Sequence, residues 1–231
     1  MSVSLDGHEA LHDRFRGKGS HGQVIQGIEN ALNAGISLFL FTVACKSLLS
    51  SLPYFVRDVY RSYPSIKSVT VIPIINTQNG DFFLAHEFIG PNEFLELVRS
   101  VSLLNLGGCT VDFLHEPLVN VVSKEMNMPW IHESPPLFRQ GSIIVMANRD
   151  VRLYHSSRHS FAQYRPGMIE KVLSSEDYQK TVAPDVATCP TCRYVELCRE
   201  NGMDRPSEPY DELDSDAASC RQILDKIEAG G

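Results

Sequence analysis

The sequence predicts an α/β protein with a parallel sheet, followed by a smaller α+β module that binds a metal centre. Two nearly continuous apolar runs of strand length, 36–43 and 69–75, alternate with segments of helical periodicity. Hydrophobic and charged residues make up 43% and 21% of the chain, as is usual for a globular protein. Four of the six cysteines gather near the C-terminal end. The apolar runs and their alternation with helical segments predict the sheet, the composition indicates a globular chain, and the cysteines predict the module.

The N-terminal part reads as strand, helix, strand, helix, strand, which is the signature of parallel α/β winding. Val3 and Leu5 alternate with polar residues, like the last half of a strand. Ser20 is expected to be the N-cap of a helix that Gly35 ends. The pattern then predicts helices at 48–59, 92–104 and 118–126 and a strand at 109–114.

The alternation of strand and helix patterns ends after Trp130, and Ser134-Pro135-Pro136 marks a domain boundary. Two β-prone segments, 143–146 and 151–154, flank four turn residues and predict a hairpin. A helix is expected after Pro166, and a last helix is expected to carry Cys220 on its apolar face.

Charge and composition restrict the class of protein. The net charge is −7 and no basic block stands out, which argues against a nucleic-acid surface. No apolar run reaches membrane-spanning length, and the N-terminus lacks the pattern of a signal peptide. Cysteines in such a chain indicate a reducing, cytoplasmic compartment, where clustered thiols favour metal binding over disulfides.

The cysteine cluster is the strongest motif. Cys189, Cys192 and Cys198 form C-x2-C-x5-C, and Cys220 supplies a fourth thiol further along. Four thiolates complete a tetrahedral zinc site or hold one cubane iron–sulfur cluster. Ligand type alone does not separate these two metal centres.

The N-terminal residues resemble a known family. Ser4-Leu5-Asp6-Gly7, followed by His12-Asp13-Arg14 and a helix that ends at Gly35, resembles the middle of a radical S-adenosylmethionine (SAM) enzyme. The resemblance implies that residues 1–130 form the C-terminal half of a partial (β/α)6 barrel, from its fourth strand onward. It also implies that Ser4 and Asp6 contact the ribose of SAM and that Arg14 contacts an anionic group of SAM or of the substrate.

Residues 131–231 resemble the SPASM extension of the same family, a small α+β module that binds auxiliary clusters. The resemblance implies that Cys189, Cys192, Cys198 and Cys220 hold one auxiliary [4Fe–4S] cluster. Enzymes with this extension usually modify peptides or proteins, so the expected partner is a peptide or protein substrate.

Two departures from the family pattern matter. The C-x3-C-x2-C motif that holds the SAM-cleaving cluster is absent, and Cys45 and Cys109 are isolated, as expected for core thiols. A second cysteine quartet of the extension is also missing, because Gly202 and His155 stand where cysteines are expected. Four other histidines share no ligand spacing and are expected to be ordinary polar residues: His86, His115, His132 and His159.

Three hypotheses follow. The chain is the C-terminal portion of a radical SAM/SPASM oxidoreductase, inactive by itself, with an upstream sequence or separate chain supplying the first strands. Alternatively, it is a non-catalytic peptide-binding remnant of that family, or a structural zinc protein that uses the same four cysteines. A half-barrel that begins in its fourth strand is further expected to expose one strand edge and to form oligomers.

Overall fold

The computed structural model describes residues 1–74, 86–114, 116, 118–134, 143–153, 159–181, 193–194, 197 and 222–229. The chain divides into two compact units. The first comprises Met1–Ser134 with Gln222–Gly231, and the second comprises Pro135–Arg221. Each unit is described by itself.

A parallel sheet forms the centre of the first unit. Its strands are β1 (Ser2–Ser4), β2 (Phe39–Ala44), β3 (Ser68–Pro73) and β4 (Val111–Phe113), in the order β1-β2-β3-β4. The predicted parallel winding is therefore confirmed. The two apolar runs form β2 and β3, whose positions at the centre of the sheet explain why both of their faces carry apolar residues.

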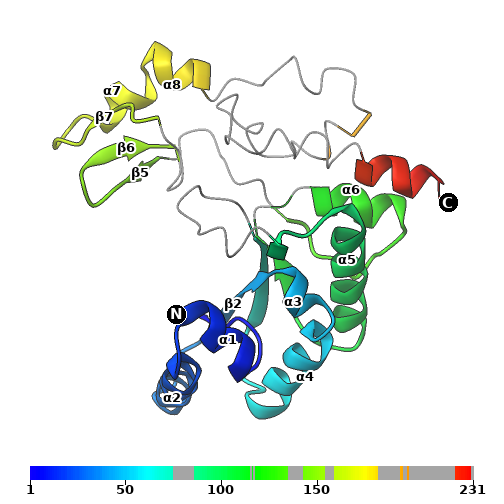
Figure 1. Cartoon of the computed structure of the whole chain (residues 1–231). Helices are drawn as coiled ribbons and strands as arrows, with labels where there is room; N and C mark the ends of the chain where they lie inside the picture. The colour runs from blue at the N-terminus through cyan, green and yellow to red at the C-terminus, as the bar shows by residue number, and fades with distance from the viewer. Residues whose placement is uncertain are drawn as a thin grey trace. The chain divides into compact units, whose positions relative to one another are not determined.

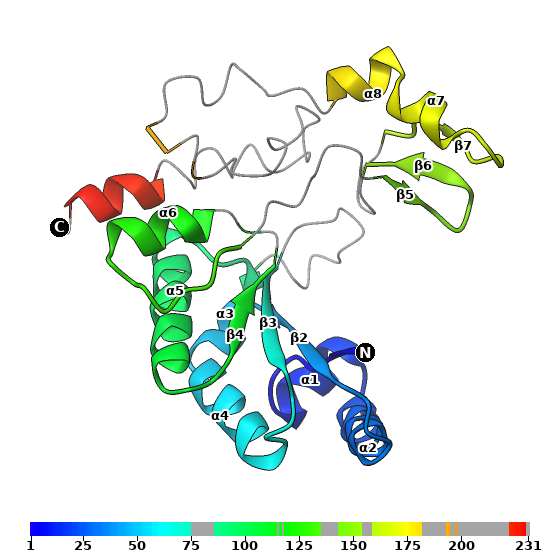
Figure 2. The same ribbon diagram turned by 180° about the vertical axis from the view of Figure 1, so that it is seen from behind.

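Helices connect the strands. Between β1 and β2 lie α1 (Glu9–Arg16) and α2 (Ser20–Asn33), and between β2 and β3 lie α3 (Lys46–Leu49) and α4 (Leu52–Ser62). The helix α5 (Pro91–Leu106) precedes β4, and α6 (Leu118–Glu125) follows it. A further helix spans 222–229. Figure 1 draws α4 and α5 in front of the sheet, and Figure 2 draws the strands in front of these helices.

The two faces of the sheet differ in what they carry. On the face that α4 and α5 cover, the buried Thr42 lies among five apolar side chains that are at most 3% exposed: Leu40, Val69, Val71, Val111 and Phe113. Side chains alternate along a strand, so the intervening residues point to the opposite face. There the strand register places one row across all four strands: Ser4, Phe41, Thr70 and Asp112.

The start of α2 differs from the prediction. Ser20 is the first helical residue, and Gly19 is the N-cap, with a left-handed φ of 81°. The Asp13 carboxylate from α1 accepts hydrogen bonds from the N–H groups of Gly19 (2.5 Å) and His21 (2.8 Å). These bonds lower the pKa of Asp13. The cap is therefore supplied by a side chain from the preceding helix, which the local sequence pattern did not indicate.

The second unit contains a small antiparallel sheet, β5 (Ile144–Val145), β6 (Asp150–Arg152) and β7 (Ala162–Gln163). The predicted hairpin is confirmed as β5 and β6, with Arg149 in the turn at a φ of 70°. The helices α7 (Ile169–Leu173) and α8 (Glu176–Thr181) follow. Tyr178, which is 1% exposed, packs edge-on against Phe161 with the ring centroids 5.4 Å apart.

Within the described residues, no helix combines the length and the apolar character that crossing a membrane requires.

Candidate functional site

The S-L-D-G segment lies at the carboxyl end of β1. Asp6 follows the strand and is 3% exposed. Its Oδ1 accepts the backbone N–H of Val43 at 2.8 Å, and its Oδ2 pairs with Nε of Arg16 at 2.6 Å. Asp6 therefore fastens the end of β1 both to β2 and to the last turn of α1.

His12 completes this contact from the inner side of α1. Its Nδ1 accepts the backbone N–H of Asp6 at 3.0 Å, and the ring is 1% exposed. Burial lowers the pKa of His12, which favours the neutral ring that this hydrogen bond requires. The proton of the neutral ring is then on Nε2, which has no hydrogen-bond partner in the part of the chain that the structure describes.

Arg14 points to a second carboxylate. Its guanidinium forms an ion pair with Glu87, whose side chain is 1% exposed. Glu87 also accepts hydrogen bonds from Ser47, from its backbone N–H at 2.9 Å and from its hydroxyl at 2.7 Å. Ser47 lies in the first turn of α3, so Glu87 joins α1, α3 and the segment before α5.

The ionisation of Glu87 follows from these contacts. Burial alone opposes the charged form, but the hydrogen bonds from Ser47 and the charge of Arg14 outweigh burial. Together they lower the pKa of Glu87 to about 2. Glu87 is thus a carboxylate at neutral pH and neutralises Arg14.

The two isolated cysteines do not resemble reactive thiols. Cys45 follows β2 and is 1% exposed, as expected for a core thiol. Burial raises its pKa to about 11. Cys109 is half-buried, and burial raises its pKa as well. Because the thiolate is the reactive form, both thiols are poor nucleophiles and poor metal ligands at neutral pH.

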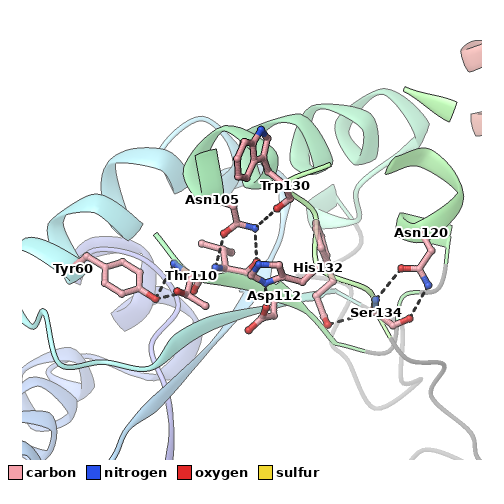
Figure 3. Close-up of polar contacts among 10 residues, drawn as sticks. Tyr60, Asn105, Thr110, Asp112, Asn120, Trp130, His132 and Ser134 are labelled. Atoms are coloured by element: carbon pink, nitrogen blue, oxygen red, sulfur yellow. Dashed lines mark hydrogen bonds and ion pairs between the residues drawn. The ribbon is translucent and has the colours of Figure 1, made fainter. Parts of the chain in front are cut away.

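At the opposite edge of the sheet, side chains bond to three outward backbone groups of β4 (Figure 3). Asn105 accepts the N–H of Val111 at 2.7 Å and donates to its carbonyl oxygen at 2.9 Å. The Ser134 hydroxyl donates to the carbonyl oxygen of Phe113 at 3.3 Å, and Asn120 holds Ser134 through both of its backbone polar groups. These contacts seal the edge of β4.

A histidine–carboxylate pair lies beside the sealed edge. Nδ1 of His132 is 2.6 Å from Oδ1 of Asp112 (Figure 3). Asp112 belongs to the row of residues on the face opposite α4 and α5, whereas His132 lies in the segment after α6. Their side chains are 34% and 52% exposed, so solvent reaches both.

The structure brings the predicted residues Ser4, Asp6 and Arg14 to one end of β1 and the adjoining helix α1. Ser4 is half-buried and belongs to the row on the sheet face opposite α4 and α5. Asp6 contacts Val43 and Arg16. The predicted metal ligands lie outside the described residues: Cys189, Cys192, Cys198 and Cys220. His155 and Gly202 also lie outside them.

Sequence reasoning missed three partners of the predicted residues. Arg16 pairs with Asp6, while Arg14 pairs with Glu87 far along the chain. Residues two positions apart in a helix point in directions that differ by about 200°, so Arg14 and Arg16 of α1 point to different sides. This periodicity is a signal that two separate acidic partners exist. No local sequence pattern indicated that His12 is buried and accepts a hydrogen bond from Asp6 at the end of β1.

The comparisons give a structural likeness only. No family model matches the chain, and no curated protein matches its sequence. Native anSMEcpe with bound AdoMet and Kp18Cys peptide superposes with a TM-score of 0.61 at 11% identity, over 99% of this chain and 69% of that chain. Native anSMEcpe with bound AdoMet gives 0.64 at 10% identity, over 99% and 68%.

The protein in those structures is an anaerobic sulfatase-maturating radical SAM/SPASM enzyme. At this level of identity the likeness shows the fold and does not by itself assign an activity. The parallel sheet with its helices matches part of a radical SAM barrel, and the predicted fold class is confirmed.

Proposed function

We propose that this chain is the C-terminal portion of a radical SAM/SPASM oxidoreductase that modifies a peptide or protein. The observation that carries the proposal is the position of S-L-D-G. This motif lies at the carboxyl end of the first strand of a parallel sheet that matches part of a radical SAM barrel. Barrels of this kind place their chemistry at the carboxyl ends of the strands. Motif and fold therefore support the same family.

The residues around the strand end differ in their fit to SAM. Ser4 offers a half-buried hydroxyl on the sheet face opposite α4 and α5, which suits a contact with the ribose. Each oxygen of Asp6 accepts one contact, and a carboxylate oxygen has a second acceptor position. Asp6 also fixes the end of β1, the strand in which Ser4 lies. The role of Arg14 toward an anion stays a prediction, because Glu87 already neutralises it.

We assign Cys189, Cys192, Cys198 and Cys220 to one auxiliary [4Fe–4S] cluster. The chemistry of the donor set supports this, since four thiolates suit a cubane cluster. Such a cluster supplies one-electron chemistry when bound, and SAM supplies radical chemistry in the complete enzyme. Zinc at the same four thiolates, in a structural protein, is the competing assignment.

The test uses the full chain purified without oxygen. The expected result is about four iron atoms per chain and a broad visible absorption band. Cys192→Ala should lower the iron content, whereas Cys109→Ala, which removes an isolated thiol, should leave it unchanged. One zinc per chain with no visible absorption, or full iron retention in Cys192→Ala, would contradict the cluster.

The same preparation tests SAM cleavage. The printed sequence lacks C-x3-C-x2-C, so with SAM and a strong reductant we expect no 5′-deoxyadenosine above a protein-free control. Clear turnover would show that another cluster site exists in this chain. The idea that a separate chain supplies the first barrel strands gains no support from the comparisons and stays a prediction.

A further inference from the structure

We propose that Asp112 and His132 form a peptide-contact site in which Nε2 of His132 accepts a hydrogen bond from the bound peptide. The inference rests on the proposed function for the identity of the ligand, a peptide. It adds to that function two residues, Asp112 and His132, that neither the motif nor the cysteine cluster indicates. It also departs from the expectation that His132 is an ordinary polar residue.

The geometry of the pair fixes the chemistry of the ring. A carboxylate can only accept, so Nδ1 of His132, 2.6 Å from Oδ1 of Asp112, must be the donor. In the neutral ring the other nitrogen, Nε2, then carries the lone pair and is an acceptor. Asp112 thereby selects one tautomer of His132 and orients its free nitrogen.

That nitrogen is available to a ligand. The side chain of His132 is 52% exposed, and Nε2 makes no hydrogen bond within the described ranges. Asp112 belongs to β4, so the strand holds the carboxylate in place, and the carboxylate in turn holds the His132 ring. A ligand donor therefore meets a fixed acceptor and loses little conformational freedom of the protein on binding.

The position of Asp112 connects the pair to the proposed SAM site. The register places Asp112 in the same row as Ser4, with Phe41 and Thr70 between them, on the face opposite α4 and α5. Three strand spacings separate the ends of this row, a distance of about 14 Å. A peptide of roughly four extended residues would span it. Phe41 offers an apolar contact along that path.

A second histidine–carboxylate pair serves as an internal comparison. His8 lies 3.2 Å from Asp58, and its side chain is 51% exposed, nearly the same as that of His132. However, its ring packs edge-on against Phe55 of α4, so it lies on the helical side of the sheet. His8 links α1 to α4 and faces away from the row that ends at Asp112.

The experiment measures binding of the Kp18Cys peptide, the ligand of one structural neighbour, to the full chain by calorimetry. The variants are His132→Phe, which keeps a ring but removes the acceptor, and Asp112→Asn. We expect His132→Phe to weaken binding by roughly three- to tenfold, the usual value of one hydrogen bond. Asp112→Asn should have a smaller effect, because the asparagine oxygen can still accept from Nδ1.

His8→Phe is the matched control and should bind as the wild type does, and thermal unfolding verifies that each variant is folded. Equal affinities of the wild type and His132→Phe would overturn this site and leave the proposed function intact. Failure of the wild type to bind the peptide would contradict the peptide partner in the proposed function, and the site with it. A shift of the His132 ring nitrogen resonance on adding peptide supports the contact directly.

Discussion

The two edges of the parallel sheet are held in different ways. On β4, the N–H and carbonyl of Val111 bond to Asn105, and the carbonyl of Phe113 accepts from Ser134. On β1, the ladder uses the odd-numbered residues, since Met1 accepts from Phe39 and Leu5 donates to Phe41. The outward groups of β1 therefore belong to Ser2 and Ser4, and they have no partner among the described residues. One edge is sealed, and the other is open.

The contacts that fasten the two edges also differ in charge. Near β1 the connections are ion pairs, Asp6 with Arg16 and Glu87 with Arg14. On the outward backbone groups of β4 they are hydrogen bonds of a neutral amide and a hydroxyl, although the Asp112–His132 pair lies beside them. Acid breaks the ion pairs by protonating their carboxylates, and it leaves the neutral hydrogen bonds intact. The two edges should therefore respond differently to pH.

The largest expected effect is at Glu87. Its folded pKa of about 2 lies below the ordinary value of 4.5. The resulting stabilisation is fully present above pH 4.5 and is lost as the pH falls through about 2. The shift corresponds to about 3 kcal/mol. Glu87→Gln should lower the free energy of unfolding by about this amount at pH 7 and by much less near pH 2, as measured by urea unfolding at both pH values.

Glu93→Gln is the control for Glu87, because Glu93 is more exposed and lies 3.6 Å from Lys46. Its cost should stay below about 1 kcal/mol. A Glu87 effect that is the same at pH 7 and pH 2 would show that charge is not what holds α1 and α3 together at Glu87.

The second expected effect is at the sealed edge. Asn105→Ala removes the partners of the Val111 N–H and carbonyl, and Val111 is fully buried. We expect a loss of about 2 kcal/mol in unfolding free energy, equal at pH 7 and pH 4. Asn30→Ala, which removes only an exposed contact with Gln26, should change it by less than about 0.5 kcal/mol. A pH-dependent loss for Asn105→Ala would contradict the division between the edges.

The smallest effect on stability concerns the open edge. An unpaired strand edge invites pairing with another chain, and exposed Phe39 and Met1 lie beside it. We expect oligomers in size-exclusion chromatography with light scattering. Ser2→Lys should shift them toward monomer, while the unfolding free energy changes by less than about 0.5 kcal/mol. A wild-type monomer at all concentrations would mean that β1 does not pair with other chains.

Apolar periodicity predicted most elements of the fold, because β2, β3 and the longer helices follow from local patterns. The helix α1 was missed, since its polar sequence is held by contacts of His12 and Arg16 with the strand end. The strand predicted at 109–114 contains Asp112, but no sequence pattern singled out this residue. Its pairing with His132, like that of Arg14 with Glu87, joins residues far apart in sequence, and no local pattern encodes such a contact.

Cys45 has a practical consequence. Its thiol is buried, and its raised pKa of about 11 keeps it protonated, so alkylating reagents should not modify it in the folded protein. Opening of the sheet near the end of β2 would expose it. The rate at which a thiol reagent labels Cys45, followed by mass spectrometry, would then report how often this part of the core opens. Cys45 is thus a built-in probe of local unfolding at the end of β2.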